Sequence, residues 1–217
     1  LRADGVEFGN PGLLAESEGP YTGIGEAGSR RLAQTGFGQG AGSWSVMQAA
    51  RVVAAVANGG NYLRCSADMR LGEPCTTVAI LAPGASTVPI LAGMKGVMDR
   101  GTGAKLAKVP GVRLYGKTGT ADAPGTRAEA AWGIRAGKAT TPHSWFVAIA
   151  EADDAEPCAA AGQRYVVASV VPHGGFGAAA AGPLAVEAVR ALQAQGYLPA
   201  PAPESASTAP ARKKASR

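Results

Sequence analysis

The residues with the clearest chemical potential in this sequence form one run, Lys117-Thr118-Gly119-Thr120-Ala121. The stretch at residues 111–118 reads G-V-R-L-Y-G-K-T, which satisfies the phosphate-binding loop pattern G-x-x-x-x-G-K-[ST] letter for letter. In such a loop, backbone N–H groups converge on phosphate and a helix begins at the Lys-Thr pair. One hypothesis for this run is therefore a nucleotide-binding site.

The local sequence disfavours that hypothesis. The four residues between the two glycines, V-R-L-Y, favour an extended strand over a curled loop. Gly119 follows the Lys-Thr pair at once and Pro124 comes soon after, so a helix would begin there with difficulty. Glu151 ends a later apolar stretch and could mimic a magnesium-holding acid, but a glutamate at a strand end is a common placement. We therefore interpret the run as a Lys-Thr-Gly motif on a strand. Nucleotide binding stays a remote alternative.

Three apolar stretches predict the strands that must position this run, at residues 112–118, 144–151 and 164–171. The second is dense enough in apolar residues to be buried on both faces. The segments between the strands carry little helical pattern, so we expect antiparallel pairing rather than helical crossovers.

Helical spacing predicts a first helix that Ser43 or Ser45 caps and that ends near Asn58, before two glycines. The residues expected on its packed face are Val46, Ala50, Val53 and Ala57. Gln48 and Arg51 fall off that face.

Two further helices and a hairpin complete the expected elements. Ser86 or Thr87 caps a helix that packs through Leu91, Met94 and Met98, and short strands at 61–64 and 77–82 precede it. A last helix begins between residues 177 and 183, ends at 196, and packs through Leu184, Ala188 and Leu192. The predicted fold class is α+β, an antiparallel sheet with helices packed on it.

Composition and charge exclude several classes of protein. The chain has 217 residues, 46% of them apolar, which suffices for one domain with a core. Its longest apolar runs fall well short of the roughly 18 residues of a membrane span. Much of the net charge of +5 lies at residues 204–217, where four basic residues accompany one acid. We interpret this as a solubilising tail, with contact to an anionic polymer or lipid as an alternative. Without a basic stripe interleaved with aromatics, we expect no nucleic-acid partner.

The cysteines and histidines show no spacing typical of a metal site, so we expect neither a metal nor a cofactor. Cys65 and Cys75 could pair in an oxidising compartment and leave Cys158 alone, or all three could be unrelated thiols. His143 and His173 are isolated in the sequence, and we interpret both as structural.

An ordered set of segments resembles the transpeptidase domains of penicillin-binding proteins, in the superfamily that includes serine β-lactamases. Lys-Thr-Gly on a strand is one of three short motifs that build the active site of that family. The segments around it also resemble the family in the same order, over about residues 38–197: G-Q-G at 38–40, V-M-Q-A-A at 46–50, A-N-G-G at 57–60, G-T-G at 101–103 and S-W-F-V-A at 144–148.

The other two family motifs, Ser-x-x-Lys with the nucleophile and Ser-x-Asn, do not occur in this sequence. Residues 8–10, F-G-N, resemble the segment just beyond the Ser-x-Asn turn. We therefore expect this chain to be the C-terminal part of such a domain, lacking its N-terminal part. Residues 1–198 would form that part, and residues 199–217 a disordered basic tail rich in Pro, Ala and Ser.

The resemblance implies a D,D-transpeptidase that forms an acyl-serine on a peptidoglycan stem peptide and that β-lactam antibiotics acylate. It implies catalytic roles for Lys117, as a fixed charge, and for Thr120, whose backbone N–H would be one of two oxyanion donors. It implies substrate-binding roles for Lys117, Thr118, Gly119, Thr120 and Ala121. This chain alone would not acylate, because the serine motif is absent.

The resemblance also implies other cell-wall synthesis proteins as partners and a location in the cell envelope, on the extracytoplasmic side of the bacterial inner membrane. Three alternatives share the fold. A serine β-lactamase would hydrolyse the antibiotic, a penicillin-sensing domain would bind it without turnover, and a degenerate scaffold would do no chemistry.

Overall fold

The computed structural model describes residues 45–64, 76–122, 141–154 and 163–200. The three cysteines, the segment before residue 45 and the tail after residue 200 lie outside the described residues, so the expectations for them stay predictions. In chain order, the elements are α3 (Val46–Ala57), β1 (Asn61–Arg64), β2 (Thr76–Ala79), α4 (Val88–Asp99), β3 (Val112–Ala121), β4 (His143–Ala152), β5 (Tyr165–Val171) and α5 (Ala181–Ala194).

The central sheet has the order β3-β4-β5, with both neighbouring pairs antiparallel, as predicted. β3 stays extended through Ala121, so no helix begins at Lys117 or Thr118, and the phosphate-binding loop is excluded. The β3–β4 register pairs Lys117 with Val147 and Gly119 with Trp145. A separate two-stranded antiparallel sheet joins β1 to β2.

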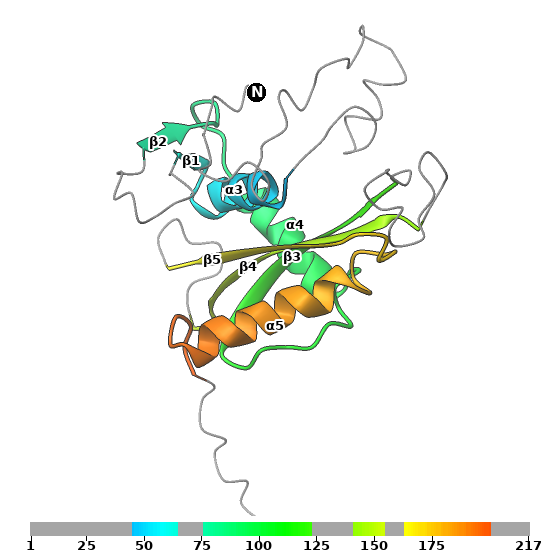
Figure 1. Cartoon of the computed structure of the whole chain (residues 1–217). Helices are drawn as coiled ribbons and strands as arrows, with labels where there is room; N and C mark the ends of the chain where they lie inside the picture. The colour runs from blue at the N-terminus through cyan, green and yellow to red at the C-terminus, as the bar shows by residue number, and fades with distance from the viewer. Residues whose placement is uncertain (1–44, 65–75, 123–140, 155–162, 201–217) are drawn as a thin grey trace, which may run out of the picture.

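Helices cover both faces of the central sheet (Figure 1). On one face, α5 packs through Ala181 and Ala185 against Phe146 and Ala148 of β4. On the other, α3 and α4 pack against a different set of strand residues, which includes Tyr115, Ile149 and Val166. Because successive strand residues point to opposite faces, β4 is buried on both faces, as expected from its apolar density.

α3 begins with a capping box that explains one departure from the predicted packed face. Ser45 Oγ accepts a hydrogen bond from the backbone N–H of Gln48, and Gln48 Oε1 accepts one from the N–H of Ser45. Gln48, which we expected off the packed face, is 5% exposed because its amide folds back onto the helix start. The prediction of its exposure was wrong.

The starts of the other two helices also refine the predictions. At α4, Ser86 Oγ accepts a hydrogen bond from the N–H of Val88, whereas the Thr87 side chain makes no capping bond. α5 turns a face of small residues toward the sheet, so Ala181, Ala185 and Val189 are fully buried. Leu184 is 54% exposed, so the prediction that it packs inward was wrong. The next residue, Ala185, faces the sheet instead.

Candidate functional site

β3 sets the directions of the side chains in the Lys-Thr-Gly-Thr run. Strand alternation places Lys117 and Gly119 on the face that α3 and α4 cover, and Thr118 and Thr120 on the face of α5. Lys117 is exposed, and its Nζ donates a hydrogen bond of 2.6 Å to the carbonyl oxygen of Thr118. Ala121 ends the strand opposite His143.

β3 pairs only with β4 within the described part of the chain, so its other edge has no strand partner there. A Cβ on Gly177 would come close to the Trp145 oxygen, the Gly119 oxygen and the Gly119 nitrogen at once, so the backbone polar groups of Gly119 face β4 and those of Thr118 face this second edge. In a β-strand, the N–H and C=O groups of residues two apart point to the same side. The backbone N–H of Thr120 therefore faces the same edge, beside the Lys117 ammonium.

Thr102, from the turn after α4, contacts the run and was not among the predicted site residues. Its Oγ1 lies 3.0 Å from Thr118 Oγ1, so the two hydroxyls share a hydrogen bond. This bond restrains the position of Thr118 Oγ1. The sequence signal for Thr102 was the G-T-G at residues 101–103, which predicts a turn before the strand. It does not predict that the Thr102 hydroxyl contacts Thr118.

Gly119 lies where three backbone segments approach one another. A Cβ on Gly119 would lie 3.0 Å from Trp145 Cβ on the neighbouring strand. On the α5 face, Gly177 lies so close that its own Cβ would come within 2.7 Å of the Gly119 oxygen and 2.9 Å of the Gly119 nitrogen. Small residues at positions 119 and 177 are thus a packing requirement of this fold.

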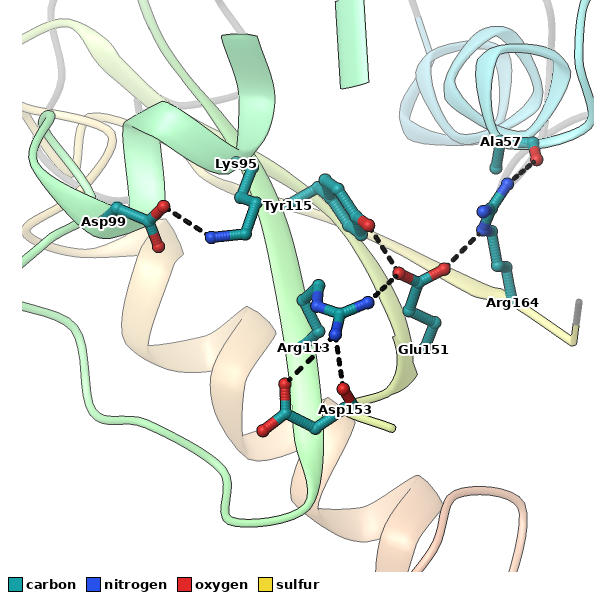
Figure 2. Close-up of polar contacts among 8 residues, drawn as sticks. All are labelled: Ala57, Lys95, Asp99, Arg113, Tyr115, Glu151, Asp153 and Arg164. Atoms are coloured by element: carbon teal, nitrogen blue, oxygen red, sulfur yellow. Dashed lines mark hydrogen bonds and ion pairs between the residues drawn. The ribbon is translucent and has the colours of Figure 1, made fainter. Parts of the chain in front are cut away.

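At the other end of β3, a buried ionic network ties the strand to its neighbours (Figure 2). Glu151 of β4 accepts a hydrogen bond from Tyr115 Oη and bonds of 3.0 Å from Arg113 Nη1 and 2.7 Å from Arg164 Nε. Arg164 Nη1 also donates to the carbonyl of Ala57 at the end of α3, at 2.8 Å. Glu151 is 2% exposed, so it is a structural anchor rather than the strand-end acid of a metal site.

The electrostatics of this network favour the charged forms of Glu151 and Arg113. Burial by itself would raise the pKa of Glu151, but hydrogen bonds from Tyr115, Arg164 and Arg113 outweigh it and hold that pKa below its ordinary value of 4.5. Burial would likewise lower the pKa of Arg113, whereas its bonds to Glu151 and Tyr115 raise it. Glu151 and Arg113 are therefore both charged at neutral pH.

The two histidines, distant in the sequence, meet beside the Ala121 end of β3. The rings of His143 and His173 lie 4.6 Å apart in an edge-on arrangement. His143 Nδ1 accepts a hydrogen bond of 3.0 Å from the backbone N–H of His173, and His173 Nδ1 lies 2.9 Å from the Thr141 oxygen. These bonds join the start of β4 to the segment after β5, which fits the structural interpretation of both residues.

Within the described ranges, no group of three or more His, Cys, Asp or Glu side chains is placed to hold a metal ion. In the same ranges, no helix has the length and apolar character that crossing a membrane requires.

Comparison with known proteins agrees with this architecture. The sequence-family model of the penicillin binding protein transpeptidase domain matches residues 3–192 of this chain. The apo structure of the TP domain from Burkholderia pseudomallei penicillin-binding protein 3 superposes with a TM-score of 0.56 at 24% identity, over 89% of this chain and 54% of that chain.

A structure of a peptidoglycan glycosyltransferase from Burkholderia ambifaria gives a TM-score of 0.54 at 22% identity, over 91% of this chain and 54% of that chain. At these identities the two structures show a common fold. This chain spans about half the length of the solved chains it matches. No curated protein matches the sequence.

Proposed function

The chain belongs to the family of penicillin binding protein transpeptidase domains, and from that premise we propose that the full-length protein is a D,D-transpeptidase of peptidoglycan cross-linking. Its substrate is a stem peptide ending in two D-alanines. A serine in a Ser-x-x-Lys motif, which these 217 residues do not contain, attacks the carbonyl between the D-alanines. The terminal D-alanine leaves, and the amine of a neighbouring stem takes the acyl group from the serine.

The observation that carries this proposal is the edge of β3. Lys117 is exposed there, and the peptide N–H of Thr120 faces the same edge. An ammonium group beside an outward N–H suits a substrate that carries a carboxylate and develops negative charge on a carbonyl oxygen. A phosphate-binding loop would need a helix start at this point.

Each residue of the run takes a role under this proposal. Lys117 supplies a fixed positive charge to the substrate carboxylate and to the proton path around the serine. The hydroxyls of Thr118 and Thr120 donate hydrogen bonds to that carboxylate. The N–H of Thr120 is one of two donors to the oxyanion, the second being the N–H of the serine. One such donor is worth on the order of 10²- to 10³-fold in rate.

Gly119 and Ala121 complete the proposed substrate edge. A larger side chain at either position would stand between the strand and an extended peptide lying along it. Because the reaction is acid–base and nucleophilic chemistry throughout, the proposal needs no metal and no cofactor. The location that follows is the cell envelope, outside the inner membrane, with other cell-wall synthesis proteins as partners.

Fluorescent penicillin tests the proposal in two parts. The purified full-length protein is expected to take up one covalent label per molecule, and the 217-residue chain is expected to take up none. Rapid hydrolysis of a chromogenic cephalosporin by the full-length protein would instead identify a β-lactamase. Stable labelling by penicillin, together with no transfer of a stem-peptide acyl group to an amine acceptor, would identify a penicillin sensor. Absence of any labelling would instead indicate a scaffold without chemistry.

A further inference from the structure

We propose that Gly177 and Ser144 are positioning residues that set the orientation of the Thr120 N–H through the peptide bond that joins Gly119 to Thr120. This inference rests on the proposed function, because it concerns the oxyanion donor. Neither residue lies on the exposed edge of β3. Both act from the opposite side of the strand, Ser144 from β4 and Gly177 from the segment before α5.

The contact between Gly177 and the strand is backbone against backbone. A Cβ on Gly177 would lie 2.4 Å from the oxygen of Trp145 and 2.7 Å from that of Gly119. The Gly119 oxygen and the Thr120 N–H belong to one planar trans peptide and point in opposite directions. A segment packed against that oxygen therefore fixes the tilt of the plane, and with it the direction of the N–H on the exposed edge.

Ser144 holds the Gly177 segment in place. Its side chain is fully buried and is the cross-strand partner of Thr120. Ser144 Oγ accepts a hydrogen bond of 3.0 Å from the N–H of Ala181, at the start of α5, and lies 3.0 Å from the oxygen of Phe176 and 3.3 Å from that of Gly177.

A second serine fixes the same helix start from β5. Ser169 Oγ lies 2.8 Å from the oxygen of Ala181. Gly182 N–H, in turn, donates to the Gly177 oxygen at 2.9 Å. The segment from Phe176 to Ala181 is thus fixed to β4 and β5, whereas β3 is paired along one edge only among the described strands. A methyl group on Gly177 would press on the Trp145 oxygen of β4 and on the Gly119 oxygen of β3, and we expect β3, the less restrained strand, to move.

The variant Gly177→Ala in the full-length protein tests this relationship. The added methyl group meets backbone atoms that cannot rotate away, and no positive φ complicates the change. We expect the rate constant of acylation by fluorescent penicillin, k2, to fall about 10-fold or more, because small displacements of a transition-state donor are costly. The dissociation constant of the complex before acylation should change less than threefold, since the charge of Lys117 still meets the antibiotic carboxylate. Ser144→Ala should lower k2 in the same direction.

Two control variants separate positioning from loss of stability. Gly93→Ala adds a methyl group in open space on α4 and should leave k2 unchanged. Val189→Ala creates a cavity in α5 at the far end of the sheet and should lower the melting temperature without lowering k2. Should Gly177→Ala fail to fold, the comparison of Ser144→Ala with Val189→Ala at matched melting temperature decides the question.

The outcomes of this experiment are distinct. A wild-type protein that takes no label contradicts the proposed function itself. A wild-type protein that labels, together with Gly177→Ala and Ser144→Ala proteins that acylate within twofold of it, contradicts the positioning role and leaves the proposed function intact. Equal losses in k2 for Ser144→Ala and Val189→Ala would also contradict it, because stability alone would then explain the change.

Discussion

The carboxylate of Glu151 lies 2.7 Å from the guanidinium Nε of Arg164, and both side chains are almost fully buried. Arg164 also binds the last carbonyl of α3, at Ala57, which is 107 residues away in the sequence. Through Tyr115 and Arg113, the same carboxylate holds β3. Glu151 therefore joins α3, β3 and the residue just before β5. Its partner Tyr115 lies two residues along β3 from Lys117.

Replacing Glu151 by Gln should destabilise the protein strongly. The change leaves Arg113 and Arg164 buried without their counter-charge, and breaking a buried ion pair in this way costs about 3–5 kcal/mol. A matched control is Asp99→Asn, which removes the acid of an exposed pair with Lys95 and should cost at most about 0.5 kcal/mol. Denaturant unfolding of the full-length proteins measures both. Equal costs for the two variants would show that the Glu151 network contributes little.

Acid should lower the free energy of unfolding by protonating the Glu151 carboxylate. The pKa of Glu151 is lower in the folded chain than its ordinary value of 4.5, so folding favours the ionised form. Its contribution to the free energy of unfolding is fully present above about pH 4.5 and is lost as the pH falls through the folded pKa. The stability gap between the wild type and Glu151→Gln should therefore narrow below about pH 4.5. A gap that stays constant down to about pH 3 would contradict this assignment.

Thr118→Val removes one hydroxyl while keeping the shape of the side chain. A hydrogen bond to a charged group is worth about 1.5–3 kcal/mol, so the efficiency of acylation by penicillin should fall about 10- to 100-fold. Thr102→Val leaves the Thr118 hydroxyl in place but frees its rotation, and should give a smaller loss. Stopped-flow labelling of the full-length variants measures both rates. A larger loss for Thr102→Val than for Thr118→Val would mean that Thr102 contacts the substrate itself.

Much of the fold was predictable because its signals are local. Apolar density indicated β3, β4 and β5 to within a few residues, and the strand-forming V-R-L-Y correctly excluded a helix at Lys117. Serines before apolar periodicity located the starts of α3 and α4. Leu198, at the end of the predicted folded region, is 5% exposed and packs in the α5 core, and the boundary near residue 199 stays a prediction.

The features that sequence reasoning missed all depend on contacts between distant segments. Glu151 was interpreted as an ordinary strand-end acid, although its partners lie 13 to 38 residues away. Nothing local distinguishes Ser144 from an exposed strand serine, yet it is fully buried and binds the start of α5. Leu184 was misplaced because small alanines, not the larger leucine, allow α5 to approach the sheet closely.

The most direct test of the account is the acylation rate of Lys117→Ala in the full-length protein, with Lys108→Ala as a matched exposed-lysine control. If the Lys117 ammonium faces a cleft for acyl transfer, Lys117→Ala should lower the rate of labelling by fluorescent penicillin about 100-fold or more, as loss of a charged transition-state contact does, and Lys108→Ala should label like the wild type. Labelling of both variants at the wild-type rate would contradict the assignment of this strand edge to the active site.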